Sequence, residues 1–121
     1  MGTPTIKVFC NGREGGEIVG FMEKQQLKED GTEYFVGKYD YINTAMGTAL
    51  KDEEGFVKIL VEKQTGKILG CHIIGTDAST LIHEVIVAMK SGDGKIYNLT
   101  NAVHIHPALN EVVSRAAYSI G

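Results

Sequence analysis

The chain has 121 residues, 43% of them hydrophobic and 22% charged, and its 12 basic and 15 acidic side chains give a net charge of −3. This length suits one domain with a single core. The acidic balance leaves no electrostatic footprint for nucleic acid or an anionic membrane. No apolar run approaches the roughly 20 residues that cross a bilayer, and the opening MGTPTIKVFC lacks the order of a secretory signal.

Cysteine usage indicates the compartment. Cys10 and Cys71 are the only two cysteines, and they lie too far apart to form a CxxC pair or a zinc knuckle. Two such residues do not make a disulfide framework, so we expect a reducing cytoplasm. Both side chains are predicted to be small buried hydrophobes rather than nucleophiles, because no basic partner is adjacent in sequence.

The N-terminal third contains few regular patterns. Residues 11–20, NGREGGEIVG, are glycine-rich and predict a loop. Residues 21–30, FMEKQQLKED, place three apolar side chains among charged ones and predict a short solvent-facing helix that stops at Gly31. Residues 34–41, YFVGKYDY, predict a strand, in which Gly37 indicates a bulge or a close backbone contact.

The middle of the chain predicts a β-hairpin. Residues 56–62 carry apolar side chains at alternate positions, residues 67–74 form a second β-rich run, and the turn 63–66 has the length used by antiparallel hairpins. Gly75 is expected to end the second strand.

Helical spacing dominates the C-terminal part. Thr76 or Asp77 is expected to cap a helix that runs to about Lys90, before Gly92 and Gly94. Residues 96–103 predict a shorter helical piece. A last helix is expected to begin at Pro107, with apolar residues three and four apart. The predicted fold class is therefore α+β, an antiparallel sheet with helices packed on one face.

The segment VHIHPALNEVV carries the candidate chemistry. Pro107 disfavours helical backbone at the preceding residue, so His106 should lie extended, just outside the helix. Glu111, five residues on, can fold back toward the imidazole. A carboxylate on one ring nitrogen fixes the tautomer and aims the other nitrogen outward, as in a general acid/base.

Two other interpretations of this segment stay open. A histidine before a proline, with a glutamate one turn on, is often only a helix cap with a surface ion pair. His104, His106 and Glu111 also reproduce the HxHx4E spacing of cupin metal sites. Here, however, these residues open an apolar-periodic helix, and Asn98 and Tyr118 stand where that motif has glycines. We therefore predict no metal.

The remaining candidates are assigned structural roles. His72 falls in a strand and His83 in a helix beside core positions, where lone histidines are usually satisfied structural residues. The acidic cluster of Asp52, Glu53 and Glu54 predicts a solvated turn. A dinucleotide site needs a GxGxxG motif that follows a strand and opens a helix. The glycines of this region do not meet these conditions, so no dinucleotide site is predicted; they are Gly12, Gly15, Gly16 and Gly20.

Three motifs in order resemble a known family. GFVKILVEKQTGKILGCHIIG, DASTLIHEVIVAMKSG and NLTNAVHIHPALNE are similar to the C-terminal dimerisation domain of the pyridine nucleotide-disulfide oxidoreductases, which include dihydrolipoamide dehydrogenase, glutathione reductase and mercuric reductase. VFCNGREGGEIVGFMEKQQLKEDG resembles the family's first strand and helix more loosely. The dihydrolipoamide dehydrogenase branch is preferred on general likeness.

The resemblance implies roles for particular residues. His106 would be the catalytic acid/base and Glu111 would orient it, with His104 in a supporting role at most. The histidine would reach across a two-fold interface, so that His106 and Pro107 lie near the flavin and the redox-active disulfide of the other subunit. The parent enzyme would use FAD and NAD(P), whereas residues 1–121 alone would be a single interface domain without flavin or turnover.

The chain departs from the family pattern in two places. Ala108 replaces the usual threonine after His-Pro, and Cys10-Asn11-Gly12 stands where the first strand usually ends in Thr-x-Pro. We expect a homodimer formed through the apolar faces of the hairpin strands and the final helix. The alternative is a stand-alone self-associating module without catalysis.

Overall fold

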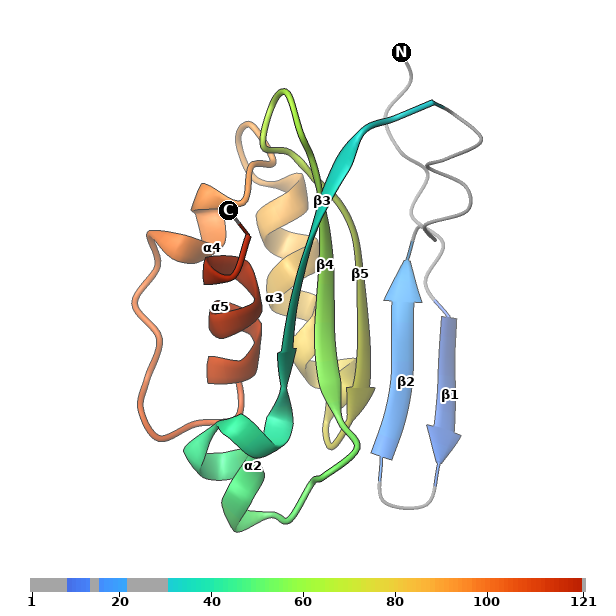
Figure 1. The fold of residues 1–121 in the computed structure, drawn as a ribbon, viewed down its shortest axis with the longest axis vertical. Helices are drawn as coiled ribbons and strands as arrows, with labels where there is room; N and C mark the ends of the chain where they lie inside the picture. Colours follow the sequence, from blue (N-terminus) through green and yellow to red (C-terminus); the bar gives the residue numbers. More distant parts are fainter. Residues whose placement is uncertain (1–8, 14–15, 22–30, 121) are drawn as a thin grey trace.

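The computed structural model describes residues 31–120 and the backbone of residues 9–13 and 16–21. Five strands form one antiparallel sheet in the order β1-β2-β5-β4-β3 (Figure 1). Their bounds are Phe9–Arg13 for β1, Gly16–Phe21 for β2, Tyr34–Asp40 for β3, Phe56–Glu62 for β4 and Ile68–Gly75 for β5. The described part of the chain is thus organised by β5, which joins the N-terminal hairpin to the rest of the sheet.

The N-terminal strands correct one prediction. Residues 11–13 and 16–20 do not form a loop, because they belong to β1 and β2, which pair with each other. β2 also pairs with β5, at Ile18↔Ile74 and Gly20↔His72. Pairing with a strand more than fifty residues away supplies backbone hydrogen bonds that local glycine content does not reveal. The helix expected over 21–30 falls outside the described residues, apart from Phe21, which ends β2.

The predicted hairpin is confirmed. β4 and β5 pair antiparallel, with a register shift between Leu60 and Val61. Val57 and Ile59 lie opposite Ile73 and Cys71, and all four side chains are fully buried on one face. Alternate residues of a strand point to the same face of the sheet. These four side chains therefore form the sheet's contribution to the hydrophobic core.

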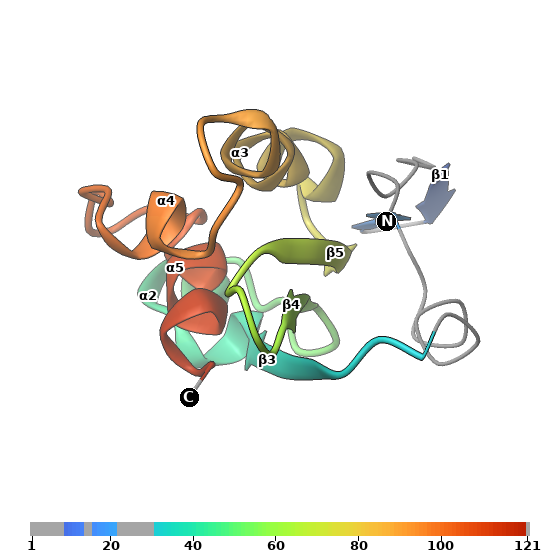
Figure 2. The same ribbon diagram turned by 90° about the horizontal axis from the view of Figure 1, so that it is seen from above.

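Helices cover that same face (Figure 2). α3, Ala78–Lys90, packs on β2 and β5, while α5, Glu111–Tyr118, packs on β3 and β4. Two short helices complete the fold, α2 over Ala45–Ala49 and α4 over Tyr97–Thr100. The α+β prediction with helices on one face is confirmed.

Gly37 marks where α5 approaches the sheet most closely. A Cβ atom at this position would collide with the backbone oxygen of Ala116 and the side chain of Ile120. The close backbone contact predicted for Gly37 is therefore present, and it is made with the last helix.

The helix ends differ from expectation in two details. Asp77 is the N-cap residue of α3, but it has a left-handed backbone (φ 57°) and makes no side-chain capping bond. α5 begins at Glu111 instead of Pro107, so residues 107–110 form a turn that leads into it. The predicted cap position of α3 is confirmed, whereas the predicted first residue of α5 was wrong.

The faces expected to form a dimer contact are already occupied. The inward side chains of the hairpin and of α5 lie in the core, where Val112, Val113 and Ala116 are fully buried. Other apolar side chains are exposed; they are Val87 on α3, Tyr97 on α4, Val103 and Ile105 after α4, and Tyr118 at the end of α5. These side chains are available for self-association on the helical side.

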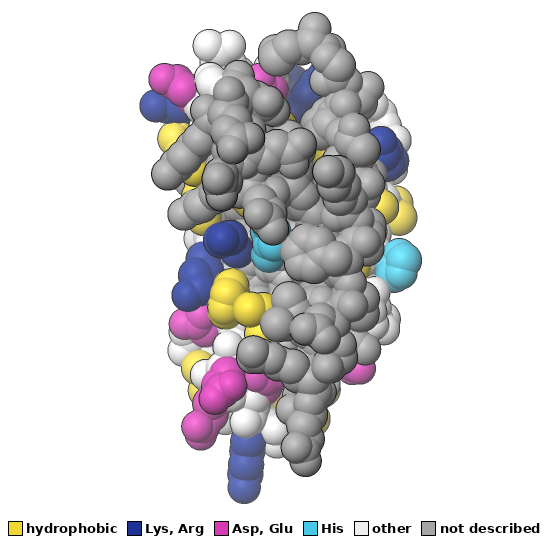
Figure 3. All heavy atoms as spheres, turned by 90° about the vertical axis from the view of Figure 1, so that its right-hand side faces the viewer, with side chains coloured by type: hydrophobic (Ala, Val, Ile, Leu, Met, Phe, Trp, Pro, Cys, Tyr) yellow, Lys and Arg dark blue, Asp and Glu magenta, His cyan; other side chains and the backbone are white. Residues whose placement is uncertain are grey.

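Seen from the β1–β2 side, basic and acidic side chains of the described residues both border the surface (Figure 3). In this view dark blue side chains gather left of the centre and magenta ones lie below them. Among the residues that the structure describes, no helix is long and apolar enough to span a membrane.

Asp52 is more than part of a solvated turn, which corrects a further prediction. Its Oδ1 accepts from the Gly55 amide at 2.8 Å, and its Oδ2 accepts from the amide and the hydroxyl of Thr76, both at 2.9 Å. Tyr41, fully buried, donates its hydroxyl to the Thr76 carbonyl at 2.9 Å. One carboxylate thus ties the loop before β4 to the end of β5, whereas Glu53 and Glu54 are exposed.

Removing this carboxylate should destabilise the domain. We expect Asp52→Ala to lower the free energy of unfolding by about 1–3 kcal/mol, because two backbone amides lose a charged acceptor. Urea unfolding followed by circular dichroism measures the change. Glu53→Ala, at the exposed neighbouring position, is the matched control, and equal midpoints for the two variants would contradict the prediction.

Candidate functional site

His106 and Glu111 lie together at the start of α5. Nδ1 of His106 is 2.9 Å from both carboxylate oxygens of Glu111, so the Nδ1–H group donates to this carboxylate. The histidine side chain is 70% exposed, while that of Glu111 is 13% exposed. With Nδ1 engaged, Nε2 has no hydrogen-bond partner within the described residues and is open to a reacting group from outside.

The turn before α5 positions Glu111. As the first residue of the helix, it folds back over residues 107–110, and the Ala108 amide donates to its Oε2 at 3.3 Å. The hydrogen bond from His106 lowers the pKa of Glu111, and the Ala108 amide adds to this effect against the opposing effect of burial. Glu111 is therefore held as a carboxylate that orients the imidazole.

His104 forms a second histidine–glutamate pair. Its Nε2 lies 2.9 and 3.1 Å from the two carboxylate oxygens of Glu84 on α3, and its Nδ1 lies 3.2 Å from the Ala102 carbonyl oxygen. Its side chain is only 8% exposed. Glu84 was not among the residues singled out from the sequence, where the only signal was a carboxylate in the middle of an apolar-periodic helix.

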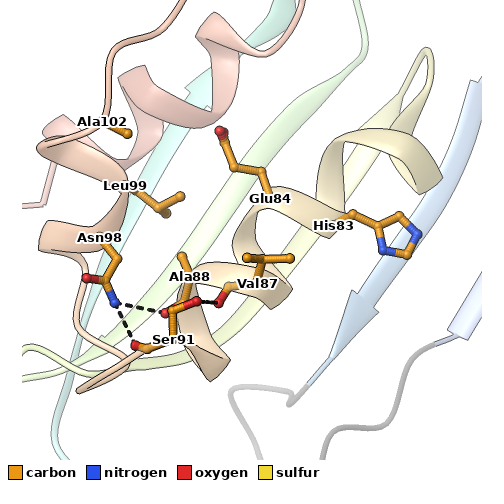
Figure 4. Close-up of a pocket in the computed structure, with 8 residues that line it drawn as sticks. All are labelled: His83, Glu84, Val87, Ala88, Ser91, Asn98, Leu99 and Ala102. Atoms are coloured by element: carbon orange, nitrogen blue, oxygen red, sulfur yellow. Dashed lines mark hydrogen bonds between the residues drawn. The ribbon is translucent and has the colours of Figure 1, made fainter.

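Glu84 also borders a groove of about 500 Å³ between α3 and α4. In Figure 4, Glu84 extends from α3 toward Ala102, whereas His83 points away toward β2. His83 is exposed on α3, next to the buried Ile82, and it also lines this groove.

The three residues of the possible metal motif do not converge. His104 pairs with Glu84 and His106 with Glu111, so the carboxylate of the motif faces only one of its histidines. Across residues 31–120, no group of three His, Cys, Asp or Glu side chains could hold a metal ion. This geometry does not favour the cupin-like alternative.

Cys71 and His72 lie where they were expected, whereas the side chain of Cys10 lies outside the described part of the chain. Cys71 is a fully buried thiol on β5, and burial raises its pKa far above the ordinary value. Cys10 lies in β1, where the structure describes only the backbone. His72 lies in β5, opposite Lys58 and Gly20 in the sheet.

The pair makes stability depend on pH. Because folding lowers the pKa of Glu111 from 4.5, the unfolded chain binds more protons in the window below that value. The stabilisation is therefore complete above about pH 5 and is lost as pH falls through the folded pKa. We expect Glu111→Gln to lower the free energy of unfolding most above pH 5, by no more than the roughly 1 kcal/mol of an exposed pair. The melting temperature should fall accordingly.

Thermal unfolding of both proteins from pH 3 to pH 7 measures this difference, with Glu54→Gln as the control for loss of one exposed carboxylate. The gap between wild type and Glu111→Gln should narrow toward pH 3. A gap that is constant over the whole range would contradict the assignment of the lowered pKa.

Comparison with known proteins identifies the fold. The family described as the pyridine nucleotide-disulphide oxidoreductase dimerisation domain matches residues 6–117. The chain belongs to this family. The resemblance found in the three sequence motifs is thereby confirmed, and the domain is of the type found in dihydrolipoyl dehydrogenases and related flavoprotein disulfide oxidoreductases.

Curated relatives of the dimerisation domain are full-length oxidoreductases. The chain is 40% identical to a leghemoglobin reductase from Glycine max and 39% identical to a mitochondrial dihydrolipoyl dehydrogenase from Pisum sativum, each over 94 residues. These alignments cover 78% of the chain but only 18% and 19% of the relatives. The chain thus spans about a fifth of their length, and its own cytoplasmic location stays a prediction.

Solved structures agree on the fold. The dimerisation domain superposes on LpdA from Mycobacterium tuberculosis with a TM-score of 0.76 and 21% identity, covering 84% of this chain and 22% of that one. A mutant of the HOCl-induced flavoprotein disulfide reductase RclA from Escherichia coli, as a Cu(II) complex, gives 0.78 and 20%, covering 90% and 25%.

Proposed function

We propose that the chain is the interface domain of a flavin-dependent, dihydrolipoamide dehydrogenase-like disulfide oxidoreductase and supplies His106 and Glu111 to the active site of the partner subunit. The observation that carries this proposal is the geometry of the pair. An exposed imidazole is held through Nδ1 by a carboxylate that is only 13% exposed, and Nε2 is left without a partner among the described residues.

The proposed chemistry is proton transfer during thiol–disulfide exchange. Nε2 of His106 takes the proton of a substrate thiol, and the resulting thiolate attacks a redox disulfide of the partner subunit. The new S–S bond joins the substrate to one cysteine, while the second cysteine leaves as a thiolate. Glu111 keeps the ring in one tautomer and stabilises the imidazolium after the proton has moved.

The cofactors of this reaction, FAD and NAD(P), would be held by other domains. All pairings in the described sheet are antiparallel, so these strands contain no parallel βαβ unit with a helix N-terminus aimed at a pyrophosphate. Bound there, the flavin would carry electrons between the disulfide and the nicotinamide. From this chain only the exposed His106 and Pro107 would approach it.

Self-association completes the proposed site. Val103 is 96% exposed and Ile105 is 72% exposed, on either side of the anchored His104. Exposed apolar side chains beside a functional residue are typical of an interaction surface. We assign them to a homodimer contact that brings His106 to the other subunit. A stand-alone module would share this contact but would need no outward-directed histidine.

Mixed dimers of the parent oxidoreductase test the proposal. One subunit carries His106→Gln and the other lacks its redox cysteines, so each homodimer is inactive. If His106 acts in the partner's active site, the mixed dimer contains one complete site and regains up to about half of the wild-type activity per dimer. Mixed dimers without activity would overturn the assignment in trans.

A further inference from the structure

The segment between α4 and α5 is held almost entirely by two side chains. Within the described residues, the amide of Ala102 donates to Leu99 O, and the next backbone–backbone bond joins Glu111 N to Ala108 O. No such bond involves residues 103–107, a stretch that contains the candidate acid/base. Its conformation therefore depends on the imidazoles of His104 and His106.

These two imidazoles are anchored to different helices. His106 binds Glu111 at the start of α5, whereas His104 binds Glu84 near the middle of α3. The His104 contact is the better shielded one, because this side chain is 8% exposed and that of His106 is 70% exposed. The contact also fixes the preceding backbone, since Nδ1 of the same ring meets the Ala102 carbonyl.

The anchors leave the residues of this segment in different surroundings. His104 faces Glu84 and is shielded, whereas His106, which faces Glu111, is exposed, as are Val103 and Ile105. Without backbone hydrogen bonds, the segment keeps this arrangement through its two bound imidazoles. Loss of the His104–Glu84 contact would free the backbone two residues before His106. The Nε2 atom of His106 would then no longer be held in one direction.

We propose that Glu84 is a positioning residue, which acts through His104 to fix the direction in which His106 and the exposed pair Val103 and Ile105 are presented to a partner subunit. The purpose of this positioning rests on the proposed function. The positioning itself can be measured in the chain alone, as the order of residues 103–106.

Nuclear magnetic resonance on the labelled 121-residue chain tests it. In Glu84→Ala, the backbone order parameters of Val103 and Ile105 should fall from about 0.85 to below about 0.6. The Nδ1 resonance of His106 should move toward that of an unpaired imidazole. Glu84→Gln should restore most of the order, because an amide can donate to or accept from Nε2 in either tautomer.

His83→Ala, at the exposed neighbouring position on α3, is the control and should leave both readouts unchanged. Unaltered order parameters and His106 resonances in Glu84→Ala would overturn the proposal. If that variant does not fold, Glu84→Asp decides, because it keeps the charge but is one methylene too short to reach the ring. Neither readout involves catalysis, so an enzyme that stays fully active with His106→Gln would refute the proposed function and leave this result standing.

Discussion

Replacing His106 by glutamine should reduce the thiol–disulfide half-reaction of the parent oxidoreductase by about a hundred- to ten-thousand-fold, the usual cost of losing one general acid/base. Glutamine can occupy the same space and accept a hydrogen bond, but it cannot take and return a proton. The side chain is 70% exposed and only its contact with Glu111 ties it to the fold. Stability should fall by no more than the roughly 1 kcal/mol of this pair, and flavin content should stay at the wild-type level.

Stopped-flow reduction of the enzyme by dithiol isolates the step, and the visible spectrum reports the flavin content. Glu111→Gln should be less severe than His106→Gln, because it disturbs the orientation of the ring and leaves the proton carrier in place. His83→Gln, an exposed histidine on α3, is the matched control. Turnover at the wild-type rate in His106→Gln would remove this residue from the mechanism.

Local patterns predicted the parts of the fold whose causes are local. The β4–β5 hairpin follows from alternating apolar residues on either side of a short turn, and α3 follows from apolar spacing of three and four. β2 was not predicted because its partner β5 is more than fifty residues away, and its glycines indicated a loop. The first residue of α5 was misplaced since Pro107 suits either a first helical turn or the turn before it.

The candidate site divides in the same way. His106 and Glu111 are five residues apart, and the proline between them limits the backbone enough for their contact to be expected. Glu84 is twenty residues before His104, and the two meet because α4 packs on α3 and brings the segment that follows it to that helix. Spacing cannot predict a pair that depends on tertiary packing.

Introducing a charge at Ile105 should weaken self-association more than any other single exposed change near the site. Ile105 lies between the two anchored imidazoles and is 72% exposed. In a dimer that buries this position, the aspartate of Ile105→Asp would lose its hydration without gaining a partner of opposite charge. For a contact of the hot-spot class, a loss of about 2 kcal/mol corresponds to a dissociation constant raised about 30-fold.

Sedimentation equilibrium of the 121-residue chain over a range of concentrations measures this constant for wild type and Ile105→Asp. Gln64→Asp adds the same charge in the exposed β4–β5 turn and should associate like wild type. Because Ile105 contributes nothing to the buried core, the variant should melt at the wild-type temperature when both are monomeric. If Ile105→Asp and Gln64→Asp associated equally well, the dimer contact would lie away from the segment that carries His106. His106 would then have no route to a second subunit through this segment.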